Sequence, residues 1–179
     1  MNRIIQAKMF AEVAHGQQKY GDGLHMDHVE DVASLVRPFA PIWGENAEII
    51  AYLHDVVEDT AVTIDDIDKN FGQFIAQCVG YLTDEPGKSR RLRKRLSNAK
   101  LALISEMFEV VLLVKPADRF SNVRACVRQR KQGLWEMYAN EHVEFRKAVY
   151  RPGLCDDLWK DLDFLMVSWP DAARILAKG

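Results

Sequence analysis

Residues 47–60 read AEIIAYLHDVVEDT, and this stretch carries both a helix pattern and a reactive cluster. The i, i+3, i+4, i+7 spacing of one helix face is followed by Ala47, Ile50, Ala51 and His54. We therefore expect His54 to point inward with the apolar side chains. Three carboxylates follow it, at Asp55, Glu58 and Asp59. Such a cluster beside an apolar stripe needs compensation, and a divalent metal ion is the simplest candidate.

Other apolar runs repeat at helical rather than strand spacing, which predicts an all-α fold. Helical stripes are formed by Ile5, Met9 and Val13, and by Val29, Val32, Ala33 and Val36 before Pro38. Thr63 and Asp66 resemble a capping box that opens a short helix ending at Phe71-Gly72. Residues 74–82 continue as a further helix. Val110 to Val114 is the one run compatible with a strand, but we expect helix there too.

Two segments interrupt the helical pattern. Residues 84–95 combine Pro86 and Gly87 with a basic run, and we expect a mobile connection there. Arg151-Pro152-Gly153 breaks the chain again, before a helix containing Leu158, Leu162 and Leu165 and a short terminal helix starting at Pro170.

Composition limits the function classes. The chain has 179 residues, 48% of them hydrophobic, which predicts one domain over residues 1–179 with a sizeable core. Its 24 basic and 26 acidic residues give a net charge of -2, so we expect neither a generic nucleic-acid binder nor a membrane-surface protein. Three separated cysteines and the absence of a membrane-length apolar run predict a cytoplasmic protein.

The metal hypothesis needs ligands from other helices, because adjacent helical residues project about 100° apart. Candidates are His28 and Asp118, the latter in the polar segment after the apolar run 110–114. Two imidazoles and two carboxylates suit manganese, iron or zinc. The alternative is a hydrogen-bonded core histidine beside a helix-end carboxylate, and a lone His-Asp pair favours that alternative.

The pair is not alone, because a series of segments resembles a known family. In order these are Ala14-His15-Gly16-Gln17, Asp27-His28-Val29, Leu53 to Thr60, Phe71-Gly72, Leu82-Thr83 and Val114 to Asn122. They resemble the HD-superfamily hydrolase domain of RelA/SpoT homologues over roughly residues 5–125. The length is similar to that of a stand-alone small alarmone hydrolase.

The resemblance implies a compact multi-helix HD-domain bundle with a metal site between helices. It also implies a Mn²⁺-dependent enzyme, with another divalent metal possible, that removes the 3′-pyrophosphate from guanosine tetra- or pentaphosphate and gives GDP or GTP. The implied metal ligands are His28, His54, Asp55 and Asp118. Glu58 and Asp59 match the acidic pair that acts on the attacking water, and Asn122 matches a substrate contact.

The match departs from the family at several positions. Lys19 and Tyr20 stand where the family has an arginine and a lysine against the purine, so an adenosine alarmone is an alternative substrate. Both residues remain candidate substrate contacts, through a phosphate for Lys19 and base stacking for Tyr20. Pro116 is tolerable if it lies in the first turn of a helix, which would place Asp118 near a helix start.

Three other histidines stay outside the predicted metal site. His15 is expected to be a supporting or packing residue, while His25 and His142 have no supporting register, although either can meet a substrate phosphate. The basic run from Lys88 to Arg95 is either a solvated helix face or compensation for a polyphosphate.

Rival functions are another HD-type nucleotide phosphohydrolase or nucleotidase, and a nucleotide-binding HD protein without catalysis. The expected partner is a small purine nucleotide with a 3′-pyrophosphate. The sequence predicts no oligomeric state.

Overall fold

The structure, a computed structural model, describes residues 2–176 and is almost entirely helical. Its first half contains α1 Arg3–His15, β1 Lys19–Tyr20, β2 Gly23–Leu24, α2 His25–Val36, the 3-10 helix η1 Arg37–Phe39, α3 Ala40–Trp43, α4 Asn46–Leu53, α5 Val56–Asp59, α6 Ile64–Phe71 and α7 Gln73–Leu82. Its second half contains α8 Arg90–Ala102, the 3-10 helix η2 Glu106–Phe108, α9 Val110–Arg128, α10 Gln132–Val149, α11 Asp156–Leu165 and α12 Trp169–Leu176. The expected all-α class is confirmed.

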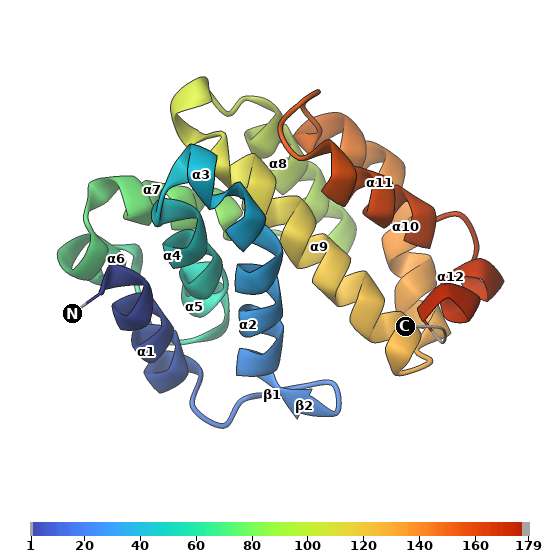
Figure 1. The fold of residues 1–179 in the computed structure, drawn as a ribbon, viewed down its shortest axis with the longest axis horizontal. Coiled ribbons are helices and arrows are strands. Elements are labelled where there is room, and N and C mark those ends of the chain that lie inside the picture. Colours follow the sequence, from blue (N-terminus) through green and yellow to red (C-terminus); the bar gives the residue numbers. More distant parts are fainter. Residues whose placement is uncertain (1, 177–179) are drawn as a thin grey trace.

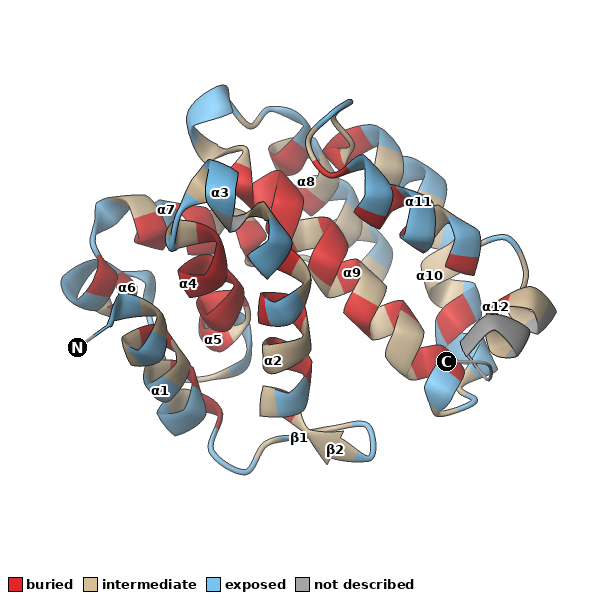
Figure 2. Cartoon of the chain, in the orientation of Figure 1, coloured by how far each residue is buried: buried red, intermediate tan, exposed pale blue. Residues whose placement is uncertain are grey.

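Helix α9 runs through the middle of the bundle (Figure 1) and packs against α2, α4 and α7 on one side and α10, α11 and α12 on the other. Its first turns are the most apolar part of the chain, and Val110 to Val114 are fully buried. The run that was compatible with a strand is therefore helical. Helix α4 is buried beside it (Figure 2) and leads into His54 and Asp55. Helix α9 contains Asp118, so three of the four predicted metal ligands lie in or next to these two helices.

Local signals place several helix ends where the sequence predicts them. Thr63 and Asp66 form a reciprocal capping box at the start of α6, with the Thr63 backbone N–H donating to the Asp66 carboxylate at 3.0 Å. Gly72 ends α6 with φ of 89°, a conformation that favours glycine. The α2 stripe of Val29, Val32, Ala33 and Val36 is fully buried, as expected.

Helix α1 forms as predicted, but its apolar stripe faces outward. The exposed fractions of Ile5, Met9 and Val13 are 53%, 50% and 85%. The buried face instead carries Ala7 and Ala11, where α1 packs against α4. Small side chains permit this close packing of two helices, so the chain buries the alanine face although the larger residues repeat with helical spacing.

The expected mobile connection over residues 84–95 was wrong in its extent. Helix α8 begins at Arg90, inside the basic run, because the Ser89 side chain caps it by accepting from the Leu92 backbone N–H at 3.2 Å. The remaining connection is residues 83–89. This connection is attached to the helix by a hydrogen bond, which Lys94 of α8 donates to the Asp84 carboxylate at 2.7 Å.

The structure does not meet the condition under which Pro116 was expected to be tolerated. Pro116 lies inside α9 and not in its first turn, because the helix already begins at Val110. Asp118 is therefore an internal helix residue, and the helix start at Val110 contributes nothing to it. Packing of the buried first turns of α9 outweighs the local cost of an internal proline.

The strands are limited to two residues each, paired antiparallel with Lys19 opposite Leu24. This hairpin leads directly into α2 and positions Tyr20 beside the first turn of that helix. Across residues 2–176, no helix is both long enough and apolar enough to cross a membrane.

Candidate metal centre and active site

The four predicted metal ligands come from three places in the bundle. His28 lies in the first turn of α2 and Asp118 in the middle of α9. His54 and Asp55 occupy the bend between α4 and α5, as the C-cap of one helix and the N-cap of the next. On one continuous helix these two residues would project about 100° apart, whereas the break between the two helices lets both side chains face the same point.

The ligand atoms converge at distances suited to one ion. The Nε2 atoms of His28 and His54 are 3.3 Å apart, and Asp55 Oδ2 lies 3.6 Å and 3.2 Å from them. Neighbouring ligands with metal bonds of about 2.1 Å lie roughly 3 Å apart, and opposite ligands roughly 4 Å. Asp118 Oδ1 is 3.5 Å from His28 Nε2 and 4.0 Å from His54 Nε2, while the group whose ligand atoms all lie within 4.8 Å of one another consists of His28, His54 and Asp55. The role of Asp118 as a fourth ligand stays a prediction.

Both imidazoles are oriented by hydrogen bonds on their far sides. His54 Nδ1 donates to the Ala51 carbonyl oxygen at 2.7 Å, and His28 Nδ1 lies 3.0 Å from Ser121 Oγ. An Nδ1 that is occupied in this way leaves the Nε2 lone pair for a metal ion. The residues present therefore fit a divalent cation, and the geometry favours the metal interpretation over an ordinary core histidine.

The charges of the group are strongly coupled. Burial opposes a charge on His54, but Asp55 and Asp118 outweigh burial and raise the pKa of His54 to about 9. Burial likewise opposes ionisation of Asp118, but Lys115 and His28 hold the pKa of Asp118 below its usual range. Without a cation, the site is thus a network of protonated imidazole and ionised carboxylates.

Lys115 is a site residue that the sequence reasoning did not single out. Its ammonium group is buried one turn before Asp118, 3.3 Å from Asp118 Oδ2, and it donates to the Leu82 carbonyl oxygen at 3.2 Å. Burial opposes its charge, but Asp118 and Asp55 raise its pKa. The available signal was the i, i+3 spacing of Lys115 and Asp118 in a segment already chosen for its polarity.

Glu58 and Asp59 lie in α5, immediately after the ligand bend. Glu58 Oε2 accepts a hydrogen bond from the Asp84 backbone N–H at 3.1 Å. Burial and the Asp84 carboxylate raise the pKa of Glu58, and burial and Asp55 raise the pKa of Asp59. A carboxylate with a raised pKa beside a metal site is suited to accept a proton from water.

Tyr20 and Asn122 contact two of the predicted metal ligands. The Tyr20 ring stacks on His28 with centroids 4.8 Å apart, and its hydroxyl donates to Asn122 Oδ1. Asn122 in turn donates from Nδ2 to the Asp118 backbone carbonyl oxygen at 3.0 Å and to the Asp118 carboxylate. Both residues also line the cavity, so their role as substrate contacts stays a prediction beside these contacts to His28 and Asp118. Lys19 is exposed at the rim.

His25 also lies at the site, although the sequence reasoning left it outside. Its imidazole is buried and its Nε2 atom lies 3.2 Å from Asp55 Oδ2. It stacks on His15, with centroids 4.2 Å apart, so His15 is the supporting residue that the sequence predicted. His142 is elsewhere, paired with Asp163 at 2.8 Å.

A cavity of about 250 Å³ opens beside these groups. Its lining includes all predicted site residues except His28 and His54, together with His25, Arg90, Lys94, Lys115, Arg119 and Tyr138. Two residues of the basic run, Arg90 and Lys94, therefore face the cavity. Glu141 binds Arg90 at 2.7 Å and the buried Arg119 at 3.3 Å, and so holds two guanidinium groups at the cavity wall.

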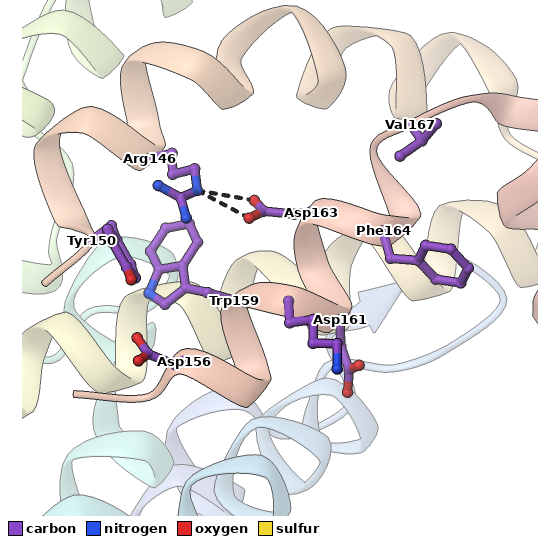
Figure 3. Close-up of a pocket in the computed structure, with 9 residues that line it drawn as sticks. Arg146, Tyr150, Asp156, Trp159, Asp161, Asp163, Phe164 and Val167 are labelled. Carbon is purple, nitrogen blue, oxygen red and sulfur yellow. Dashed lines mark hydrogen bonds and ion pairs between the residues drawn. The ribbon is translucent and has the colours of Figure 1, made fainter. Parts of the chain in front are cut away.

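A larger cavity, of about 550 Å³, lies between α10 and α11 and contains none of the predicted residues. Figure 3 shows Arg146 paired with Asp163 in its lining, beside Tyr150 and Trp159. Arg146 Nε and Asp163 Oδ2 are 3.0 Å apart. None of the residues lining it is a histidine or cysteine. The convergence of ligands and raised carboxylate pKa values assigns the chemistry to the smaller cavity.

Comparisons with known proteins agree with this choice. Guanosine-3′,5′-bis(diphosphate) 3′-pyrophosphohydrolase MESH1 of Drosophila melanogaster is 31% identical over 150 residues, covering 82% of each chain. The human protein of the same name is 30% identical over 83% of each chain. A GTP pyrophosphokinase rsh of Brucella ovis is 34% identical over 96% of this chain, which spans 23% of that larger protein.

One solved structure, described as a metazoan orthologue of SpoT that hydrolyses ppGpp and plays a role in starvation responses, superposes with a TM-score of 0.77. Its sequence is 26% identical, and the match covers 91% of this chain and 93% of that one. No family model matches the sequence.

Proposed function

Because the chain belongs to the family of guanosine-3′,5′-bis(diphosphate) 3′-pyrophosphohydrolases, we propose that it removes the 3′-pyrophosphate from guanosine 3′,5′-bis(diphosphate). Water attacks the phosphorus bound to the ribose 3′ oxygen. The bond between that oxygen and phosphorus breaks, the 3′ oxygen takes a proton, and GDP and pyrophosphate leave. The observation that carries the proposal is the convergence of His28, His54, Asp55 and Asp118 beside the Glu58-Asp59 pair.

We propose Mn²⁺ as the resident ion, held by the two imidazole Nε2 atoms and the two aspartates. Mixed nitrogen and oxygen ligands suit manganese, with iron and zinc as alternatives. When bound, such an ion polarises a phosphoryl oxygen and lowers the pKa of water. Ser121 and the Ala51 carbonyl group keep the two rings in the orientation that binding requires.

Glu58 acts in this proposal as the base that takes the proton from the attacking water. Its raised pKa lies closer to neutral pH than that of an ordinary glutamate, which improves proton transfer. Asp59, less buried and also raised in pKa, supports the same water. Lys115 interacts electrostatically with Asp118, Asp55 and Glu58, and its positive charge offsets part of their negative charge.

Positive groups on the opposite wall bind the phosphates that do not react. Arg90 and Arg119 are positioned there by Glu141, and Lys94 by Asp84. Guanidinium groups form strong, oriented hydrogen bonds with phosphate oxygens. This arrangement supports a polyphosphorylated nucleotide as substrate and favours hydrolysis over the rival function of a binding protein without catalysis, since Glu58 and all four ligands are present.

Adenosine 3′-pyrophosphates are the alternative substrates, with adenine in place of guanine as the nucleobase. Tyr20 had been the candidate for base stacking, but its ring already stacks on His28. A nucleotide panel tests the proposal: with Mn²⁺, guanosine 3′,5′-bis(diphosphate) should release intact pyrophosphate. A nucleotidase of the same superfamily would release orthophosphate instead.

Two variants separate metal binding from catalysis. Asp55→Ala should lose both the ion and turnover, because it removes a ligand. Glu58→Gln should retain the ion and lose most activity, because it removes only the base. Full activity in either variant would contradict the mechanism.

We also propose that residues 1–179 form one phosphohydrolase domain that acts in the cytoplasm. The buried apolar side chains from α1 to α12 belong to one cluster, which supports a single domain. All three cysteines are free and buried, which suits a reducing compartment.

A further inference from the structure

The basic run over residues 88–95 divides into two faces. Arg90 and Lys94, one helical turn apart on α8, line the active cavity. The other four cations, which we call the outer basic face, are Lys88, Arg91, Arg93 and Arg95. All of these are exposed except Arg93, which is half-buried. None of the four lines the cavity, and none forms an ion pair with another of the described residues.

Helix stability does not account for the outer basic face. Ser89 is the N-cap of α8, so Arg91 and Arg93 lie among the first four helical positions, and the first turn contains no acidic residue. The positive end of the helix dipole favours carboxylates at these positions and disfavours cations. Arg91 and Arg95, four positions apart, add repulsion between like charges. Charges that oppose local stability and have no partner within the fold indicate a function.

The cavity itself offers an anion little net attraction. Five lysine and arginine side chains and four carboxylates belong to its lining. Glu141 and Asp84, outside the lining, pair with three of those cations. The formal charges of these lysine, arginine and carboxylate groups therefore nearly cancel, and one divalent ion leaves only a small positive excess. The outer basic face, in contrast, carries four positive charges that no carboxylate offsets.

The outer basic face adjoins the mouth of the cavity. Arg91 follows Arg90 and Arg95 follows Lys94 in the sequence, and consecutive Cα atoms lie about 3.8 Å apart. The distance over which these charges act on an approaching ion is the Debye length, about 8 Å at physiological ionic strength. The cavity, at about 250 Å³, is smaller than the roughly 300–1,000 Å³ of most small-molecule sites. A nucleotide with two diphosphate groups therefore extends beyond the mouth.

We propose that the outer basic face steers polyphosphorylated nucleotides into the cavity, so that its charges raise the rate of association without contacting the bound nucleotide. The inference rests on the proposed function, because it takes that nucleotide as the ligand. Charges of one sign around a cleft raise association rates roughly 10-fold to 1,000-fold, and salt removes the gain. A polymer such as RNA suits this face less well, because the cations are confined to residues 88–95 of a chain with a net charge of -2.

Association kinetics test the proposal. Stopped-flow fluorescence follows a labelled guanosine 3′,5′-bis(diphosphate) binding to the full-length, Mn²⁺-loaded Glu58→Gln protein, in which hydrolysis is suppressed. In that background we replace Arg91 and Arg95 together by glutamine, which has a similar helix propensity. At about 0.01 M salt the association rate constant should fall about 3-fold to 10-fold, with the dissociation rate constant unchanged. The difference should disappear near 1 M salt, where the Debye length is about 3 Å.

Two further double variants are controls. Lys69→Gln with Lys160→Gln removes the same charge from exposed positions of α6 and α11, neither of which lines the active cavity, and should associate at the parent rate. Arg91→Lys with Arg95→Lys keeps the charge and should also associate at the parent rate. Circular dichroism and thermal melting confirm that each variant is folded.

An unchanged association rate in Arg91→Gln with Arg95→Gln, or an equal loss in the Lys69-Lys160 control, overturns the proposal. A raised dissociation rate with unchanged association also overturns it, and identifies the two arginines as direct contacts of the bound nucleotide. Hydrolysis by the wild type is assayed separately. Charge-dependent association of a nucleotide that is not hydrolysed would contradict the proposed function alone. Hydrolysis with charge-independent association would contradict steering alone, and a nucleotide that does not bind at all would contradict both.

Discussion

His28 and His54 face each other through Nε2 atoms 3.3 Å apart, while the Nδ1 atom of each ring is hydrogen-bonded on its far side. Two lone pairs at this distance repel unless a cation or a proton lies between them. In the metal-free protein a proton fills that role, because Asp55 and Asp118 outweigh burial and raise the pKa of His54 to about 9. Metal binding must displace that proton.

Mn²⁺ binding should therefore be linked to pH. Below about 9, each binding event releases a proton from His54, so the affinity should rise with pH and level off above that value. Calorimetric titrations in buffers of different ionisation enthalpy count the protons released. An affinity that stays constant from neutral pH to about 9 would show that His54 is already neutral in the metal-free protein.

Ser121→Ala should weaken metal binding without removing a ligand. The hydroxyl group lies 3.0 Å from His28 Nδ1 and fixes the orientation of the ring. Loss of such a partner typically costs about 10-fold to 100-fold in metal affinity. Competition with a fluorescent chelator measures the change, and Ser168→Ala, near the start of α12, serves as the control. Equal affinities in both variants would mean that packing alone orients His28.

Tyr20→Phe separates two roles of Tyr20. The variant keeps the ring that stacks on His28 but loses the hydroxyl that donates to Asn122. Loss of one hydrogen bond costs about 1 kcal/mol, so metal affinity should fall several-fold while the KM for nucleotide changes little. A raised KM with unchanged metal affinity would instead identify Tyr20 as a direct substrate contact.

Asp84→Asn should shift the pH dependence of hydrolysis. Glu58 works as a base only when ionised, so activity falls as pH drops through its raised pKa. Burial is the largest cause of the raised pKa of Glu58, and the negative charge of Asp84 is the second. The variant removes the charge but keeps the backbone N–H that binds Glu58, so the acidic limb of kcat/KM should move to lower pH.

Asp68→Asn, on the exposed side of α6, is the control for this shift and should leave the profile unchanged. An unmoved acidic limb in Asp84→Asn would show that another group titrates there.

Glu141→Gln should destabilise the fold. Glu141 pairs with Arg90 and with Arg119, whose guanidinium is buried over the rings of Tyr138 and Phe145. Among the described residues, Glu141 is the only carboxylate paired with this buried guanidinium, so its removal should cost about 3 kcal/mol in the free energy of unfolding, measured in urea. Glu136→Gln, at an exposed position of the same helix, is the control. Equal stability of the two variants would show that solvent, and not Glu141, compensates Arg119.

Most of the helices follow from spacing and capping signals within the sequence. Val29 to Val36 and Thr63 to Asp66 define their helices through contacts between residues no more than two turns apart. The errors arose where tertiary packing outweighed the local pattern. The bundle buries Ala7 and Ala11 in place of the larger stripe of α1, and the buried start of α9 retains Pro116 within a helix.

The site residues also separate into those that the sequence predicts and those that only the tertiary structure brings together. The resemblance to a family identifies four of them, because their order and spacing match its metal ligands: His28, His54, Asp55 and Asp118. His25 and Glu141 were missed because their contacts join elements far apart in the sequence: His25 meets Asp55 across 30 positions, and Glu141 meets Arg90 across 51. The hydrogen bond of Tyr20 to Asn122, across 102 positions, likewise has no local signal in the sequence.

The most direct test of the central claim is hydrolysis in heavy-oxygen water, with Mn²⁺ and guanosine 3′,5′-bis(diphosphate). If water next to Glu58 attacks phosphorus, the products are GDP and pyrophosphate, and mass spectrometry finds the heavy oxygen in pyrophosphate only. Release of orthophosphate, heavy oxygen in the nucleotide, or no product from the metal-loaded protein would contradict the account.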